Sequence, residues 1–253
     1  MENKKNQEKS PLLGVLGGLG PMSTVYFCEM LNRHTLACCD SDHIDMIISS
    51  RATTPDRTAY ILGTSDRDPL PVMIEEAHRL TRAGAELIVI PCNTAHYFYD
   101  GLAKECDVPI LNIIEETVVH LAAGGIRRFG LLATEGTVFS GSYHRLCTAH
   151  GLECLTPERE EQALITSVIY DSVKQNKPVD MEAFLHVAEQ LRKRGCERLV
   201  LGCTELSLLK RNGLDENLFT DSLEVLAYRT ILSCNKTPIG FPNAFDQIRK
   251  SHR

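Results

Sequence analysis

The sequence predicts an α/β protein with two pseudosymmetric lobes, each a short, mostly parallel sheet flanked by helices, and a site in the cleft between the lobes. Two observations support this fold class. Apolar runs of strand length alternate with amphipathic segments along the 253 residues, an order that produces parallel sheets covered by helices. In addition, one segment of the sequence occurs twice, at a spacing that suits two similar α/β lobes.

The predicted strands are short apolar runs that fit the length of buried strands. They are Leu12–Gly17, Ile44–Ser49, Leu87–Pro91, Pro109–Ile113, Phe129–Ala133 and Arg198–Leu201. Between them, Pro71–Ala83 and Met181–Arg194 have apolar residues at helical spacing. Each of these segments is followed by a glycine, the residue that commonly ends a helix, so we expect a helix in both places.

The repeat consists of Thr81–Thr94 (TRAGAELIVIPCNT) and Arg192–Glu205 (RKRGCERLVLGCTE). A shift of 111 positions places glycine on glycine and Cys92 on Cys203. A second, weaker pair is Gly14–Leu16 and Gly130–Leu132. Each half therefore has a helix, a strand and a cysteine at the end of that strand. The alternative is a chance similarity of two strand–helix units, because glycine before an apolar strand is common.

The repeat divides the chain into two predicted lobes with one cysteine motif each. We assign residues 1–108 together with 218–253 to the N-terminal lobe, and residues 109–217 to the C-terminal lobe. Residues 1–10 and those from about 235 to 253 are expected to be polar tails, the latter because glycine and proline interrupt any helix there.

Charge and hydropathy exclude several classes of partner. A net charge of −6 and a pI near 5.9 argue against nucleic acid, which needs a clustered cationic surface. No apolar run approaches the roughly 20 residues of a membrane span, and the polar start of the chain does not resemble a signal peptide. The glycines of the first loop do not fit the G-x-G-x-x-G nucleotide motif. We predict a soluble, cytoplasmic protein.

Ten cysteines are many for such a protein, yet they form no C-x-x-C pair and no Cys/His spacing typical of a zinc site. Without a secretory signal, a disulfide framework is not expected either. Most of these cysteines are therefore predicted to be small, buried hydrophobic residues, and no metal site is predicted.

Cys92 and Cys203 differ from the others because both follow the carboxyl end of a predicted strand, where parallel sheets bind ligands. The residues after each cysteine can start a helix, whose N-terminus would favour a thiolate; lowering a thiol pKa by about 1.5 needs roughly 2 kcal/mol. If the two lobes face each other, one thiolate could remove an α-proton while the other thiol returns a proton to the opposite face. Racemisation needs such a pair, although simple packing is an equal alternative at this point.

Four loops of the chain resemble those of the aspartate/glutamate racemase superfamily, over about residues 12–228. The motifs are Gly17-Gly18-Leu19-Gly20-Pro21, Pro91-Cys92-Asn93-Thr94-Ala95-His96, Leu131-Leu132-Ala133-Thr134-Glu135-Gly136-Thr137 and Leu201-Gly202-Cys203-Thr204-Glu205-Leu206. The resemblance implies a two-lobe fold with the active site in the cleft, no cofactor, a homodimer, and Cys92 and Cys203 as acid/base catalysts.

Within that superfamily the chain resembles the aspartate racemases. It has Glu205 where glutamate racemases usually have histidine. The resemblance assigns Arg57 (in Pro55-Asp56-Arg57-Thr58) and Lys174 (in Ile169-Tyr170-Asp171-Ser172-Val173-Lys174) to the side-chain carboxylate of the substrate, which arginine can bind with two hydrogen bonds. The α-carboxylate or the ammonium group would contact the remaining motif residues, which are Asn93, Thr94, Thr134, Thr137 and Thr204.

Several roles stay open on the sequence alone. Glu205 can orient the Cys203 thiol or cap a helix. His96 is expected to be solvated or to cap a helix, with assistance to catalysis as the minority alternative. Asp56 can tune Arg57 or the charge of the site. The predicted ligand is a small acidic amino acid, aspartate first. The alternatives are a racemase or isomerase acting on glutamate or another acidic substrate, a non-catalytic sensor of acidic metabolites, and a redox or metal role for the cysteines.

Overall fold

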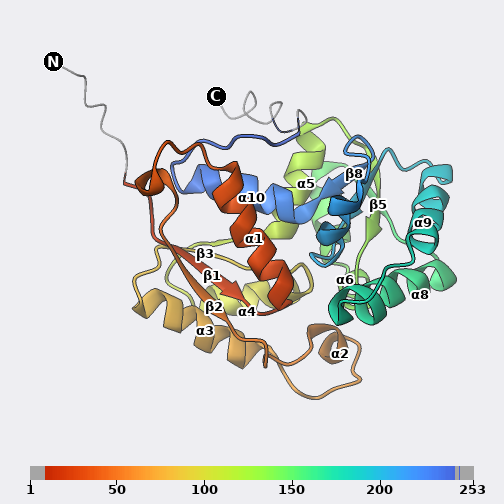
Figure 1. Ribbon diagram of the computed structural model, residues 1–253. Helices are drawn as coiled ribbons and strands as arrows, with labels where there is room; N and C mark the ends of the chain where they lie inside the picture. Colours follow the sequence, from red (N-terminus) through yellow and green to blue (C-terminus); the bar gives the residue numbers. More distant parts are fainter. Residues whose placement is uncertain (1–8, 243–244, 246–253) are drawn as a thin grey trace.

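The computed structural model describes residues 9–242 and residue 245, and it contains two parallel sheets with the same strand order (Figure 1). The first sheet has the order β2-β1-β3-β4 and the second the order β6-β5-β7-β8. The strands are β1 (Leu13–Gly17), β2 (Met46–Ser50), β3 (Leu87–Val89), β4 (Ile110–Leu111), β5 (Arg128–Leu132), β6 (Glu153–Leu155), β7 (Arg198–Leu201) and β8 (Phe219–Asp221). The predicted α/β fold with two similar lobes is confirmed.

Helices connect successive strands and cover the sheets. The α-helices are α1 (Pro21–His34), α2 (Arg57–Ile61), α3 (Leu70–Arg82), α4 (Tyr99–Lys104), α5 (Ile113–Ala123), α6 (Glu135–Ser140), α7 (Ser142–His150), α8 (Arg159–Ser167), α9 (Met181–Lys193) and α10 (Ser222–Ser233). Shorter helical segments are η1 (Asp40–Asp42), η2 (Thr94–Phe98), η3 (Val168–Ser172), η4 (Val173–Gln175) and η5 (Leu206–Asn212). None of the helices in the described residues is both long and apolar enough to cross a membrane.

The two helices expected from the repeat are α3 and α9, and each is within one residue of its predicted bounds. Gly84 and Gly195 follow them with φ angles of +99° and +88°, in the left-handed region that glycine adopts without strain. All six predicted strands are present, but β2 begins at Met46 rather than Ile44. Strands β6 and β8 were not predicted, because each has only three residues and their sequences, Glu-Cys-Leu and Phe-Thr-Asp, contain no apolar run.

The strand pairing moves both internal lobe boundaries. Strand β4 pairs with β3, so the first sheet continues to Leu111, beyond the predicted boundary at residue 108. Strand β8 pairs with β7, so the second sheet continues to Asp221, beyond the predicted boundary at residue 217. The rest of the assignment of residues to the two lobes remains a proposal. In both halves the fourth strand completes its sheet after a crossover segment; β4 lies within the predicted run Pro109–Ile113, whereas no predicted run marks β8.

The helices α1, α5, α7 and α10 lie between the two sheets and share one core with them. This core contains fully buried side chains from the first sheet, such as Val15 and Val89, and from the second, such as Leu131 and Val200. Helix α3 covers the outer face of the first sheet, and α8 and α9 cover that of the second (Figure 1). The sheets are therefore joined by a common apolar layer.

The predicted tail from about residue 235 is wrong for its described part. Leu36 N–H donates to the Thr237 carbonyl at 2.8 Å, and Ile239 N–H donates to the His34 carbonyl at 2.8 Å. Farther on, the ring of Phe245 packs 5.0 Å from that of Tyr228. Backbone pairing and aromatic packing hold this segment against α1 and α10, whereas residues 1–8, 243–244 and 246–253 lie outside the described part.

Gly130 offers a test of the close packing between β5 and α9. A methyl group on its Cα would lie 2.9 Å from Leu191 Cδ1 and 2.8 Å from Leu199 Cδ2. We expect Gly130→Ala to lower the free energy of unfolding by about 1–3 kcal/mol, because the core must shift to admit the methyl group. Denaturant unfolding followed by circular dichroism measures this free energy. The control is Gly124→Ala, whose methyl group meets only contacts of 3.4 Å or more, so its free energy of unfolding should change little. Equal effects of the two substitutions would contradict this packing.

Candidate active site

The predicted motifs converge where the two sheets have their carboxyl ends. In a parallel sheet of order 2-1-3-4 the strand order reverses between the first and third strands, because successive strands are added on opposite sides of this position. Ligands bind at such a topological switch point. The loops after β1 and β3 contain Gly18–Gly20 and Cys92, and the loops after β5 and β7 contain Thr134 and Cys203. The equivalent positions of both sheets therefore contribute to one site.

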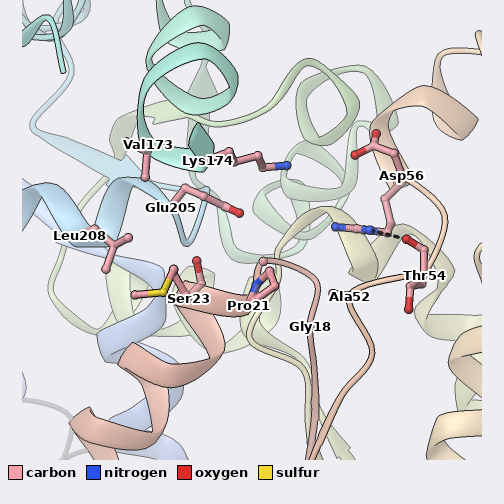
Figure 2. Close-up of a pocket in the computed structure, with 13 residues that line it drawn as sticks. Gly18, Pro21, Ser23, Ala52, Thr54, Asp56, Val173, Lys174, Glu205 and Leu208 are labelled. Carbon is pink, nitrogen blue, oxygen red and sulfur yellow. Dashed lines mark hydrogen bonds between the residues drawn. The ribbon is translucent and has the colours of Figure 1, made fainter. Parts of the chain in front are cut away.

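The site consists of two connected spaces. The chamber is a cavity of about 330 Å³ lined by the start of α1 and by Thr54, Val173 and Leu208 (Figure 2). The inner compartment contains the thiols of Cys92 and Cys203 and has a volume of about 10 Å³, roughly the space of a single water. Four charged residues line both spaces; they are Asp56, Arg57, Lys174 and Glu205.

Cys203 is held by a carboxylate. Its Sγ donates a hydrogen bond to Glu205 Oε2 at 3.0 Å, and both side chains are buried. Burial, followed by the negative charge of Glu205, raises the pKa of the Cys203 thiol well above its ordinary value, and the charge of Lys174 opposes this. Glu205 makes no side-chain cap bond to η5. The sequence allows two roles for Glu205, contact with the Cys203 thiol and capping of a helix. The structure contains the contact with the thiol.

Cys92 has a different environment. Burial raises the pKa of its thiol, while the Arg57 charge and the Ala95 N–H lower it. Helix N-termini were expected to favour a thiolate, but short 3₁₀ segments follow both cysteines, and burial is the largest influence on both thiol pKa values. Arg57 favours the thiolate at Cys92, whereas Glu205 keeps the proton on Cys203.

Arg57 is buried, with 8% of its surface exposed. It is the first residue of α2, and the Asp56 carboxylate caps this helix by accepting from Ala59 N–H. Its Nη1 donates to the Thr54 and Pro55 carbonyls and its Nη2 to the Leu19 carbonyl. A guanidinium has five N–H groups, so Nε–H and one Nη2–H remain for a ligand. Among the described residues no carboxylate forms an ion pair with Arg57, although buried charges are normally paired.

Lys174 reaches the site from the turn after a π-helical segment, η3, a distortion that is frequent at functional sites. Its Nζ lies 4.1 Å from the ring centre of Tyr170, a cation–π contact. Burial opposes the charged amine, but Glu205 and Tyr170 outweigh it and raise the pKa of Lys174. Tyr170 lines the inner compartment, and sequence reasoning missed this although the residue stands in the motif that identified Lys174.

Three threonine hydroxyls from both halves of the chain form a closed triangle. Thr94 Oγ1 lies 2.9 Å from both Thr134 Oγ1 and Thr137 Oγ1, and the last two lie 3.0 Å apart. Thr134 also caps α6 by accepting from the Thr137 N–H. Thr94 and Thr134 line the inner compartment, so the triangle can present hydroxyl donors to a carboxylate there.

Asn93 and Thr204 line the same compartment but have partners in the protein. Asn93 Nδ2 donates to Ser222 Oγ at 2.9 Å, and its Oδ1 accepts from the Tyr143 hydroxyl at 2.7 Å. Thr204 Oγ1 donates to the Pro91 carbonyl at 3.3 Å, across the two cysteine loops. These bonds fix the loops that hold the thiols; contact with a ligand remains a prediction for both residues.

His96 does not line the site, and the expectation of a solvated side chain is wrong. It is 5% exposed; its Nδ1 lies 2.8 Å from the Cys92 carbonyl and its Nε2 accepts from Ile113 N–H at 3.3 Å. It therefore fastens the cysteine loop to the start of α5, in agreement with the capping alternative. Within the described residues, no cluster of His, Cys, Asp or Glu side chains could hold a metal ion, and all ten cysteines are free.

Comparison with known proteins gives four relevant findings. The model of the Asp/Glu/Hydantoin racemase family matches residues 16–227. A broad specificity amino-acid racemase, RacX, of Bacillus subtilis is 27% identical over 229 residues, which are 87% of this chain and 96% of that protein. Aspartate racemase from Picrophilus torridus superposes with a TM-score of 0.76 at 27% identity, covering 90% and 96% of the two chains. An aspartate racemase homologue from Pyrococcus horikoshii OT3 gives a TM-score of 0.72 at 26% identity, with 88% and 99% covered.

The burial of His96 predicts an acid-sensitive stability. Desolvation lowers the pKa of His96 from 6.5 to about 4, so this side chain takes up a proton on unfolding between these pH values. The free energy of unfolding should therefore fall as the pH drops from 6.5 towards 4, by about 1 kcal/mol per pH unit for this residue. Denaturant titrations at several pH values should give a shallower slope for His96→Gln than for the parent, and an unchanged slope for the exposed control His150→Gln. An identical slope in all three proteins would contradict a neutral, buried His96.

Proposed function

The chain belongs to the Asp/Glu/hydantoin racemase family, and we propose that it interconverts L- and D-aspartate by proton transfer between Cys92 and Cys203, without a cofactor. The observation that supports this most is the pair of buried thiols, one from each sheet, in a single compartment next to Arg57 and Lys174. An amino acid held between the thiols would present one face of its α-carbon to each.

The two thiols supply a balanced proton transfer. A thiolate on one side takes the α-proton and becomes a thiol, while the thiol on the other side donates its proton to the opposite face and becomes a thiolate. The unlike surroundings of the thiols favour a resting form with Cys92 as the base and Cys203 as the acid. After one turnover the protonation states of the two cysteines are exchanged. The enzyme then catalyses the reverse reaction, or the two cysteines return to the resting form by exchanging protons with solvent.

The substrate is proposed to be held at two carboxylates. The free Nε–H and Nη2–H of Arg57, with Lys174, would bind the β-carboxylate in a charge-assisted arrangement. The hydroxyl triangle around Thr94 would bind the α-carboxylate and receive negative charge as the carbanion develops. The inner compartment must widen to admit a ligand, since its volume matches one water; closing afterwards excludes water and strengthens these contacts.

A second candidate is a racemase with another acidic substrate, such as glutamate. The chamber beyond Arg57 and Lys174 is large enough for an added methylene, a difference worth only about 1–3 kcal/mol. The relative with broad specificity supports this alternative, whereas the aspartate racemase neighbours support aspartate. A homodimer and a cytoplasmic location stay predictions from the sequence.

The two-thiol mechanism is tested by proton NMR of L-aspartate in deuterated water under reducing conditions. The parent should lose the α-proton signal and form D-aspartate. Cys92→Ala and Cys203→Ala should each lower racemisation by about 10²–10⁴-fold, because one acid/base group is absent, and residual exchange should be confined to one enantiomer. Cys196→Ala, a buried cysteine outside the site, is the control. Racemisation that survives either catalytic substitution would exclude the mechanism, and no exchange with aspartate or glutamate would favour the sensor.

Replacing Arg57 tests the choice of substrate. We expect Arg57→Ala to lower kcat/KM for aspartate by about 10–100-fold, the loss of a charge-assisted hydrogen bond of ~1.5–3 kcal/mol. Arg82→Ala, an exposed arginine at the end of α3, should have no effect. Steady-state kinetics give kcat/KM for aspartate and for glutamate in the parent and in both variants. A glutamate rate above that for aspartate in the parent would overturn aspartate as the substrate.

A further inference from the structure

Three buried polar atoms at the wall of the chamber have no hydrogen-bond partner in the described residues. They are Arg57 Nε, Ser23 Oγ and Glu205 Oε1, and their side chains are 8%, 1% and 6% exposed. A buried polar group without a partner costs about 1–3 kcal/mol, so three of them around one cavity indicate a ligand. Arg57 is already assigned to the β-carboxylate, which leaves the two oxygens to be explained.

Ser23 Oγ and Glu205 Oε1 border the same small space beside Gly20. A methyl group built on the Gly20 Cα would collide with Glu205 Oε1 and lie 3.3 Å from Ser23 Oγ. Glycine at this position, directly before α1, therefore lets the Glu205 carboxylate lie against the start of that helix, next to Ser23. Figure 2 shows the Ser23 oxygen pointing towards the Glu205 carboxylate, with Lys174 and Asp56 farther along the cavity.

Charge decides which group can occupy this space. The start of α1 would favour an anion, but a carboxylate oxygen already faces the space and would repel one. A hydroxyl oxygen and a carboxylate oxygen are both acceptors, so together they suit a cationic group with several N–H donors. The opposite side of the cavity, with Arg57 and Lys174, suits carboxylates. The Asp56 carboxylate also lies on that side, where its Oδ1 accepts from Ala59 N–H at the start of α2. Apart from Asp56, the wall is divided into a side that accepts hydrogen bonds and a side that donates them.

We propose that Glu205 Oε1 and Ser23 Oγ form the subsite for the α-ammonium group of the substrate, at the wall of the chamber beside Gly20. This assignment rests on the proposed function and completes it, since three separate subsites would then hold the two carboxylates and the ammonium of aspartate. Three points of attachment fix the α-carbon between the thiols. Because Glu205 Oε2 holds the Cys203 thiol, an ammonium on Oε1 also offsets the negative charge that keeps the proton on Cys203.

The test compares aspartate with succinate, which has the two carboxylates but no ammonium. Calorimetric binding is measured in a Cys92→Ala background, so that aspartate is not racemised and the Cys203–Glu205 contact stays intact. Ser23→Ala should weaken aspartate binding about 5-fold, and Glu205→Gln about 10–100-fold, the range for hydrogen bonds to neutral and charged groups. Neither substitution should weaken succinate binding, and Ser167→Ala, an exposed helical serine, should change neither ligand. Gly20→Ala, whose methyl group would displace Glu205 Oε1, should also weaken aspartate binding but not succinate binding, and circular dichroism checks that each variant is folded.

The outcomes separate the two proposals. Selective loss of aspartate affinity in Ser23→Ala and Gly20→Ala supports the ammonium subsite even if Glu205→Gln does not fold. Equal losses for aspartate and succinate would assign these residues a structural role and overturn the subsite, as would affinities that do not change. If the background protein binds neither ligand, the proposed function fails, and the subsite with it.

Discussion

Desolvation of two thiols is the constraint on which the rest of the site depends. Burial alone favours the neutral thiol at both Cys92 and Cys203, so any thiolate must be stabilised by nearby charge. In this fold such charge comes from segments that follow the carboxyl ends of the strands. Arg57 arrives from the start of α2 and Lys174 from a π-helical turn, and backbone carbonyls or an aromatic ring hold each in place.

The two halves of the chain have equivalent topology but unlike chemistry. A shift of 111 residues places Thr94 of the first half on Glu205 of the second and His96 on Ser207. The first pair gives one loop a hydroxyl triangle and the other a carboxylate against its thiol. The second pair has one structural task in both halves: His96 contacts the start of α5, and Ser207 bonds Asp221, the cap of α10. The scaffold is therefore duplicated, whereas the acid/base groups around the thiols have diverged.

Local patterns in the sequence sufficed for six of the eight strands, for α3 and α9, and for the convergence of the cysteine loops, because apolar runs and the glycines after helices act over a few residues. They failed where long-range contacts decide. Three features depend on contacts between separate segments of the chain: the pairing of β6 with β5 and of β8 with β7, the packing of Phe245 on Tyr228, and the burial of His96. The raised pKa values of the thiols could not be anticipated either, because desolvation depends on the whole enclosing structure. Ser23 and Tyr170 stand inside or beside quoted motifs, yet only the cavity wall gives them a role.

The apolar layer shared by the two sheets has a mechanical consequence. Val15 and Val89 of one sheet and Leu131 and Val200 of the other belong to one core with α1, α5, α7 and α10 between them. Swinging the sheets apart as rigid halves about a hinge would expose this core to water, at a free-energy cost that grows with the apolar area uncovered. Small movements of the segments at the rim would admit a ligand at a lower free-energy cost. These segments are α2, which contains Arg57, and the η3–η4 turn, which contains Lys174. The residues that we propose to bind the carboxylate would then also be those that move to admit it.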